Sequence, residues 1–313
     1  MSALLSYGEV LIDFLPDNDN GSYYPMAGGA PANVAVAYSK LGGRSFFAGG
    51  ISTDNFGVML KQQLQQEGVN TQFVKDVEKA NTAMVLVSLD REGERSFNFY
   101  RHETADTQYG KAQINHINWQ DISLFHFCSN TLTSKSINSS TLYALKKAKL
   151  NNTLISFDVN LRQQLWADLN LLPQRVQAAI ALSDIVKFSR EEADYLALQN
   201  EMRYKEYIAK LISCGVKLII VTDGANDVQV VSESFTEFFS VPNITAVDTT
   251  AAGDSFIASF LFAITQQSIS TGLARTLIDL NNVTTAISFA AKCGAYTCQR
   301  KGAFSALPSM TDI

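Results

Sequence analysis

The sequence lacks the short motifs that identify the commonest nucleotide-binding proteins. It contains no GxxxxGK[S/T] loop, no GxGxxG after a strand and no HRD-like catalytic loop. These motifs bind phosphates through backbone N–H groups and a lysine, or they position a catalytic aspartate. Their absence argues against a P-loop nucleotidase, a dinucleotide-binding enzyme and a protein kinase.

Cysteine, histidine and basic charge are also scarce. The four cysteines, Cys128, Cys214, Cys293 and Cys298, form no CxxC pair, so we expect reduced core thiols and neither a disulfide framework nor a zinc site. The three histidines lack the spacing of metal ligands. A formal net charge of -5 provides no basic field, so we expect no nucleic-acid partner.

Long apolar runs and a basic N-terminal segment are missing as well. No apolar stretch approaches the length of a bilayer span, and residues 1–5 lack the basic region of an export signal. We therefore expect a cytoplasmic protein without a membrane partner. With 313 residues, the chain is long enough for one main α/β domain with an appendage.

Strand-like and helix-like apolar patterns alternate through most of the chain, which predicts a parallel sheet covered by helices on both faces. The expected strands are 4–15, 45–51, 122–128, 153–157, 185–188 and 218–222, with antiparallel edge strands at 228–231 and 235–241. Helices are expected at 31–41, from about residue 55 to residue 68, and at 134–147, 173–182, 190–198, 203–213 and 255–265. A long segment with periodic apolar residues follows at 273–292.

Residues 71–106 change to a period of two, which predicts a hairpin with a polar turn at 91–94. Such a hairpin does not easily join a parallel sheet. We therefore expect one domain over residues 1–313, with a small β lid contributed mainly by residues 14–28 and 71–106. The lid residues Phe97 and Phe99 could pair with a second copy to form a homodimer.

Polar residues follow the expected strand ends, where ligands of open α/β sheets bind. Asp13 can accept hydrogen bonds from sugar hydroxyls, although a turn-forming aspartate also explains it. Gly28 and Gly29 allow the backbone to approach a ligand, and Asn33 offers a donor and an acceptor from a first helical turn. Arg101 either contacts a polar substrate or is a solvated edge residue.

Two further loops carry charge that suits phosphate chemistry. Arg162 closes the loop that begins at Asp158, and it can balance the charge of a transferring phosphoryl group. Glu192 follows Lys187 and could orient a magnesium-bound water, or it could be an ordinary acid in the first turn of a helix.

The segment 247–256 is the one around which the chain is organised. A bend of small residues leads directly into an apolar helix, and the N–H groups at such a helix start attract an anion. The same field favours the ionised form of Asp254, which can then take a proton from a hydroxyl. The pattern indicates phosphoryl transfer, with ordinary helix-start aspartates as the alternative.

These motifs together resemble the paired signatures of the ribokinase-like sugar kinases: Gly28-Gly29 with Asn33, then the segment from Asp248 to Asp254. The resemblance spans nearly the whole chain and is most similar to bacterial fructokinases, through residues 28–35, 93–97 and 158–162 with Trp166. It implies a ribokinase-like α/β fold and an ATP-dependent kinase that converts D-fructose to fructose 6-phosphate.

The resemblance also implies a role for each matching residue. Asp254 is the catalytic base, and the backbone N–H groups of three residues form the anion hole: Ala251, Ala252 and Gly253. The sugar is held by Asp13, Gly28, Gly29 and Asn33, with Arg101 and Arg162 near it. The ATP phosphates and Mg²⁺ lie near Lys187, Glu192, Thr222 and Gly224. A monovalent cation, usually potassium, lies near Asp248, Thr250 and Gly302.

Three departures from that pattern affect the nucleotide side. Ala251 replaces a frequent glycine, which backbone donors tolerate if its φ stays negative. Ser189 replaces a frequent asparagine, and Asp227 replaces a glycine. Two alternatives to a fructokinase stay open: an aminoimidazole riboside or other nucleoside-type kinase, which shares the pattern at 158–162, and a catalytically inactive sugar-binding regulator.

Overall fold

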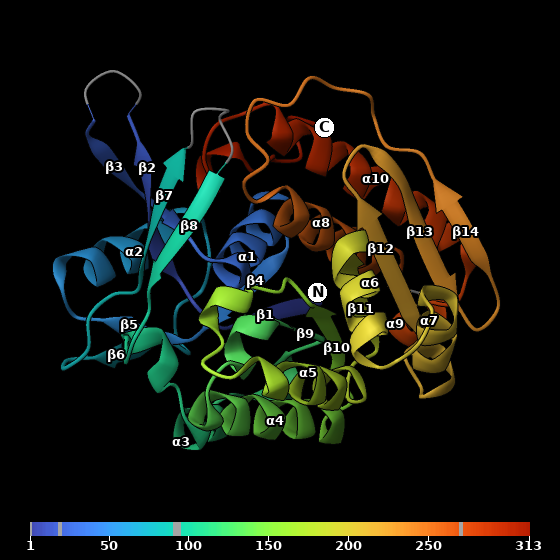
Figure 1. Cartoon of the computed structure of the whole chain (residues 1–313), viewed down its shortest axis with the longest axis horizontal. Helices are drawn as coiled ribbons and strands as arrows, with labels where there is room; N and C mark the ends of the chain where they lie inside the picture. Colours follow the sequence, from blue (N-terminus) through green and yellow to red (C-terminus); the bar gives the residue numbers. More distant parts are fainter. Residues whose placement is uncertain (1, 18–20, 90–94, 269–271) are drawn as a thin grey trace.

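The computed structural model describes residues 2–17, 21–89, 95–268 and 272–313. In this part of the chain, the largest sheet has eight strands, six of them parallel, and two antiparallel strands, β13 and β14, lie at one edge (Figure 1). Its order is β14 (Thr236–Phe239), β13 (Asn226–Ser232), β12 (Leu218–Asp223), β11 (Ile185–Ser189), β10 (Leu154–Asp158), β9 (Leu124–Cys128), β1 (Ala3–Tyr7) and β4 (Arg44–Ala48). The predicted alternation and the two edge strands are confirmed.

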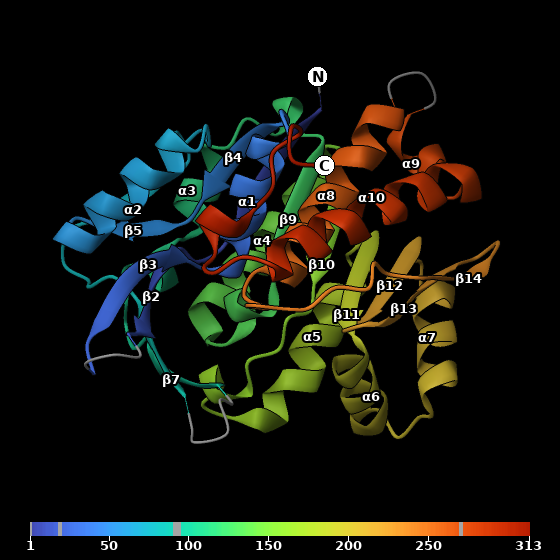
Figure 2. The ribbon, with the colours of Figure 1, turned by 90° about the horizontal axis from the view of Figure 1, so that it is seen from above.

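Helices cover both faces of this sheet because successive strand residues point to opposite faces and both sets are apolar. Leu4 and Leu124 belong to one core, which is completed by helices α1 (Ala30–Lys40), α2 (Asn55–Gln66), α8 (Ala252–Gln267) and α10 (Leu280–Cys298). Leu5 and Phe125 belong to the other, with α3 (Lys111–Asn115), α4 (Lys135–Leu150), α5 (Leu172–Ile180), α6 (Arg190–Gln199) and α7 (Tyr204–Ser213). Figure 2 looks down onto α1, α8 and α10, with strands of the sheet behind them.

A second sheet of four strands lies to the left of the main body in Figure 1. Its order is β3 (Tyr23–Gly28), β2 (Leu11–Pro16), β7 (Met84–Leu89) and β8 (Arg95–Tyr100). β7 and β8 pair antiparallel, as the period of two predicts, and the expected turn at 91–94 lies outside the described residues. A ring contact between Phe14 and Phe56 joins this sheet to α2.

Two expected strands are each divided between two sheets, which corrects the sequence prediction. The chain leaves the main sheet at Gly8, whose φ of 149° and tight contact with Pro31 suit only a glycine, so residues 4–15 form β1 and β2. Residues 45–51 likewise form β4 and then β5 (Gly50–Ser52), which pairs with β6 (Lys75–Val77).

The long periodic segment at 273–292 is also divided. A short helix, α9 (Leu273–Thr276), ends before Asp279, whose side chain accepts a hydrogen bond from the Asn282 N–H and starts α10. An N-terminal cap of this kind begins a new helix because it satisfies a backbone donor. Among the described helices, none combines the length and the apolar character that crossing a membrane requires.

Candidate active site

A cavity of about 780 Å³ lies at the carboxyl ends of the parallel strands and is also lined by residues of the second sheet. It is lined by residues that follow or end β1, β9, β10, β11 and β12, together with the start of α8. The sequence-predicted residues that line it are Asp13, Gly29, Asn33, Arg162, Lys187, Glu192, Thr222, Asp248, Thr250, Ala251, Gly253 and Asp254. The structure therefore brings most of the predicted site together.

The start of α8 presents backbone donors to this cavity. In the described part of the chain, the N–H groups of Ala251 and Gly253 have no backbone acceptor, whereas the Ala252 N–H donates to the Thr249 carbonyl oxygen at 3.3 Å. Ala252 does not line the cavity. Donors at a helix start, reinforced by the helix dipole, form a binding site for an anion.

The condition under which a methyl group is tolerated at Ala251, a negative φ, is not met. Ala251 is the residue before the helix and has φ 59° and ψ 7°, which lies in the left-handed region. A side chain with a Cβ is strained there by about 1–2 kcal/mol. The bend therefore keeps the geometry that a glycine would adopt, and the methyl group of Ala251 makes that geometry costly.

Asp254 lies in the first turn of α8 with its carboxylate in the cavity. Its Oδ2 accepts a hydrogen bond from Asn33 Nδ2 at 2.7 Å, across 221 residues of sequence. Burial raises the pKa of Asp254 to about 6, and the negative charge of Asp158 adds to this, while the Asn33 hydrogen bond opposes it. A carboxylate with this pKa is ionised at pH 7 and basic enough to accept a proton.

Asp13 lies on β2 of the second sheet and not at the end of a main-sheet strand. Burial raises its pKa to about 7, with a further contribution from the negative charge of Asp254. Gly28 does not line the cavity, but any side chain at this position would collide with Asp13 Oδ2. Gly29 has φ 106° and would collide with the Glu9 carbonyl oxygen if it had a Cβ. The two glycines therefore let β2, β3 and α1 meet at the cavity.

Lys187 is a buried cation beside the anion-binding helix start. Its Nζ contacts both carboxylate oxygens of Asp158 at 3.0 and 2.9 Å, and it lies 3.3 Å from the position that a Cβ on Gly253 would occupy. Burial alone would lower the pKa of Lys187, but neighbouring carboxylates, Asp158 above all, raise it. Lys187 therefore stays charged, and a lysine of this kind can bind a phosphate as a point charge.

Glu192 and Ser189 bond each other at the start of α6, which gives the serine at position 189 a structural role. Ser189 Oγ accepts the Glu192 N–H, and Glu192 Oε2 accepts the Ser189 N–H, which is a capping box at the start of α6. Glu192 Oε1 also accepts the Leu161 N–H at 2.6 Å. Glu192 thus ties the loop that carries Arg162 to α6, and its side chain lines the cavity with that of Glu191.

The three residues expected near a monovalent cation also meet. Asp248 is buried, its Oδ1 accepts the Thr250 N–H at 2.8 Å, and its Oδ2 accepts the Gly302 N–H at 3.0 Å. The Cys298 carbonyl oxygen accepts the N–H groups of Val247 and Asp248. These contacts hold the bend before α8 against the end of α10.

Three further predicted residues, Arg101, Gly224 and Gly302, do not line the cavity. Arg101 does not line it: its guanidinium is buried in an ion pair with Asp106 and donates to the Asn130 carbonyl oxygen at 3.0 Å. Gly224 has φ 57° and forms the turn between β12 and β13. Gly302, with φ 97°, acts through its N–H on Asp248.

Sequence reasoning missed Glu9 and Asn130 as cavity residues, and it placed Asp158 in a strand-end loop without giving it a role. All three are nearly inaccessible to solvent and line the cavity. The sequence contained a pattern that could have identified them. Each is a polar residue at or just after the end of an apolar strand, where ligands of α/β sheets bind.

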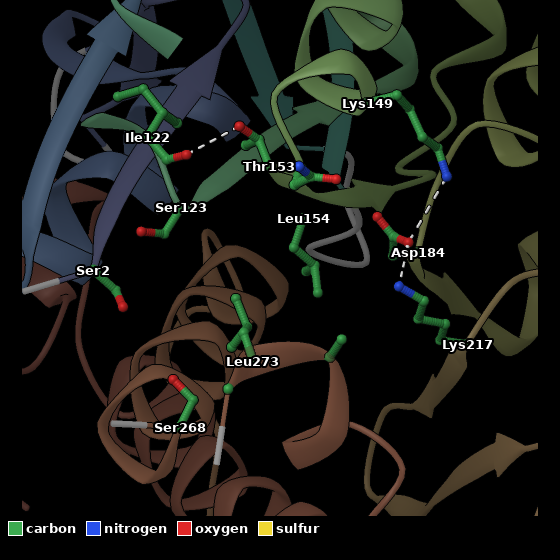
Figure 3. A pocket seen from close by; sticks show the side chains of 13 residues that line it. Ser2, Ile122, Ser123, Lys149, Thr153, Leu154, Asp184, Lys217, Ser268 and Leu273 are labelled. Atoms are coloured by element: carbon green, nitrogen blue, oxygen red, sulfur yellow. Dashed lines mark hydrogen bonds and ion pairs between the residues drawn. The ribbon is translucent and has the colours of Figure 1, made fainter. Parts of the chain in front are cut away.

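A second cavity, of about 730 Å³, lies at the opposite ends of the same strands (Figure 3). Its charged lining residues are two lysines and one aspartate: Asp184 lies between Lys149 and Lys217 and also accepts the Ile155 N–H. The described lining of this cavity contains none of the predicted catalytic residues.

An α/β sheet, an anion-binding helix start and a carboxylate beside it define a phosphotransferase with an alcohol acceptor. A model of the pfkB family of carbohydrate kinases matches residues 1–310, and the chain belongs to this family. Its fold is ribokinase-like, as the resemblance implied.

Curated and solved relatives extend over almost the whole chain. The chain is 36% identical to a fructokinase of Vibrio alginolyticus, over 98% of this chain and 96% of the relative. It is similar to the crystal structure of a fructokinase with bound ATP from Xylella fastidiosa, with a TM-score of 0.94 and 34% identity over 99% and 96% of the two chains.

Two further structures are relevant to ligands. A fructokinase double mutant of Vibrio cholerae, in fructose-, ADP- and potassium-bound form, has a TM-score of 0.86 and 32% identity over 99% and 96% of the chains. An aminoimidazole riboside kinase of Salmonella enterica, with aminoimidazole riboside and an ATP analogue, has a TM-score of 0.81 and 28% identity over 98% and 97%.

Proposed function

We propose that this carbohydrate kinase is a fructokinase, which transfers the γ-phosphoryl group of ATP to the hydroxyl at carbon 6 of D-fructose. The position of Asp254 carries the proposal, because its carboxylate lies in the cavity beside the donors that start α8. Sugar binding alone requires no base next to an anion site, so this arrangement favours an enzyme over an inactive regulator. The fructokinase relatives, similar over their full length, support fructose as the acceptor.

In the proposed reaction, Asp254 removes the proton of the acceptor hydroxyl as that oxygen attacks the γ-phosphorus in line. The N–H groups of Ala251 and Gly253 stabilise the charge on the transferring group, and Lys187 and Arg162 contribute positive charge from the cavity wall. Asn33 holds the carboxylate of Asp254 in place and so fixes the direction of attack.

We propose Mg²⁺ and K⁺ as the cations. Mg²⁺ suits the side of the cavity where the carboxylates of Glu191 and Glu192 lie, because hard cations take oxygen ligands, and it would neutralise phosphate charge. K⁺ suits the oxygen-rich bend around the buried Asp248, and the Vibrio cholerae relative with a potassium ion supports it.

We further propose that the second sheet is a lid that excludes water from the reaction. Phe97 and Phe99 of β8 line the cavity, which supports this role. Tyr23, Tyr24 and Tyr100 are 41–58% exposed on the same sheet, which supports a homodimer formed through the lid. We place the enzyme in the cytoplasm, because all four cysteines are free.

A coupled assay of ADP release tests the proposal with fructose, ribose and aminoimidazole riboside as acceptors. We expect the highest kcat/KM with fructose and a rate that rises when K⁺ replaces choline. A preference for the riboside would instead identify a nucleoside-type kinase. Tight fructose binding without ADP release from any acceptor would identify a sugar-binding regulator.

A further inference from the structure

Two asparagines in the cavity are oriented in the same way. Asn33 donates through Nδ2 to Asp254 at 2.7 Å, and Asn130 donates through Nδ2 to Glu9 Oε1 at 2.8 Å. Both asparagines are buried, with 4% and 6% of their surface exposed, and both line the cavity. In both contacts the amide nitrogen donates and a carboxylate oxygen accepts, so the amide oxygen is the end turned away from the carboxylate.

Neither amide oxygen has a hydrogen-bond partner among the described residues. A buried acceptor without a donor is costly, so such atoms in a ligand cavity indicate where ligand donors bind. The acceptor of a sugar kinase supplies hydroxyl donors. Asn33 is already expected at the sugar, whereas the sequence gives Asn130 no role.

We propose that Asn130 is a specificity-determining residue, whose Oδ1 accepts a hydrogen bond from a sugar hydroxyl other than the one that is phosphorylated. The inference rests on the proposed function, because it requires a sugar in this cavity. The phosphorylated hydroxyl gives its proton to Asp254, whose described amide partner is Asn33, whereas the side chain of Asn130 donates to Glu9. Asn130 therefore acts on recognition and not on proton transfer.

Two further residues hold Asn130 in position. Glu9, which follows β1, fixes its side chain. Arg101, which follows β8 of the second sheet, donates to the Asn130 carbonyl oxygen and is itself held by Asp106. Asp106 also accepts the Thr104 hydroxyl at 2.6 Å. Glu9 and Arg101 are therefore positioning residues. Arg101 does not line the cavity, but its ion pair with Asp106 helps to hold Asn130 in place.

The test compares wild-type enzyme with Asn130→Leu on fructose and on four analogues that each lack one hydroxyl: 1-deoxy-, 3-deoxy- and 4-deoxyfructose and 2,5-anhydromannitol. With fructose we expect kcat/KM to fall about 10- to 100-fold, mainly through KM, with the KM for ATP unchanged. For one analogue the two enzymes should differ by less than about threefold, because it lacks the hydroxyl that Asn130 recognises. That analogue identifies the hydroxyl.

Asn138→Leu is the matched control. Asn138 also has a buried Oδ1 without a partner among the described residues, but it lies on α4 and does not line the cavity. We expect its kinetics to equal those of wild type. If Asn130→Leu does not fold, Asn130→Ala takes its place in the same comparison.

Glu9 variants test the positioning role. Glu9→Gln keeps an acceptor for Asn130 and should retain near wild-type discrimination, whereas Glu9→Leu should lose the same analogue preference as Asn130→Leu. An equal loss on fructose and on all four analogues, or no loss at all, overturns the inference. Failure of wild-type enzyme to phosphorylate fructose contradicts the proposed function instead, and the comparison is then made with deoxy forms of the acceptor that is used.

Discussion

Replacing Asp254 by Asn tests the catalytic base most directly. The amide has the size of the carboxylate, and its oxygen can still accept the hydrogen bond that Asn33 donates at 2.7 Å. The variant should therefore fold and bind fructose with a dissociation constant within about tenfold of wild type. Since the amide cannot take a proton, we expect kcat to fall about 10²- to 10⁴-fold.

The same variant should change the pH dependence of stability. The pKa of Asp254 is about 6 in the folded enzyme against an ordinary value of 3.8, a difference of about two units. At about 1.4 kcal/mol per unit, the ionised carboxylate destabilises the fold by about 3 kcal/mol above pH 7. The unfolded chain loses this proton at a lower pH than the folded chain does. The free energy of unfolding of the wild type therefore falls as the pH rises from about 4 to 6.

Urea unfolding at several pH values measures this effect. The free energy of unfolding of Asp254→Asn relative to wild type should increase by up to about 3 kcal/mol between pH 4 and pH 7. Glu237→Gln, an exposed change on β14, should show no such trend. A kcat within tenfold of wild type in Asp254→Asn would refute the base assignment, and a constant stability difference across this range would refute the burial argument.

Three more predictions concern the cavity. The value of kcat/KM should fall as pH drops below about 7, because Asp13 and Asp254, with pKa values of about 7 and 6, must be ionised to accept protons and hydrogen bonds; a flat profile between pH 5 and 8 would contradict this. Ala251→Gly should stabilise the protein by about 1 kcal/mol in thermal unfolding by removing left-handed strain, whereas Ala252→Gly, inside α8, should not; equal effects of the two would refute the strain. Lys187→Met should lose about 3 kcal/mol of stability, because it leaves the buried Asp158 unpaired, and should raise the KM for ATP more than tenfold, because it removes a positive charge from the cavity. Adding Asp158→Asn should restore stability but not ATP affinity.

Much of the fold could be predicted from the sequence because its signals are local. Alternating strand and helix periods predicted the parallel sheet, the period of two predicted the β7–β8 hairpin, and the small-residue bend predicted the start of α8. Hydrophobic periodicity and turn residues act within a few positions, so a single chain segment is enough to read them.

The sequence by itself determined that an acid follows a small-residue bend and that polar residues end the apolar strands. Only the tertiary structure decided that Asn33 meets Asp254, that Glu9 meets Asn130, and that Arg101 turns away from the cavity. The first two contacts join residues 221 and 121 positions apart. The position of Arg101 depends on Asp106, which pairs with its buried charge. No local pattern encodes such choices, because they depend on how separate strands and helices pack together.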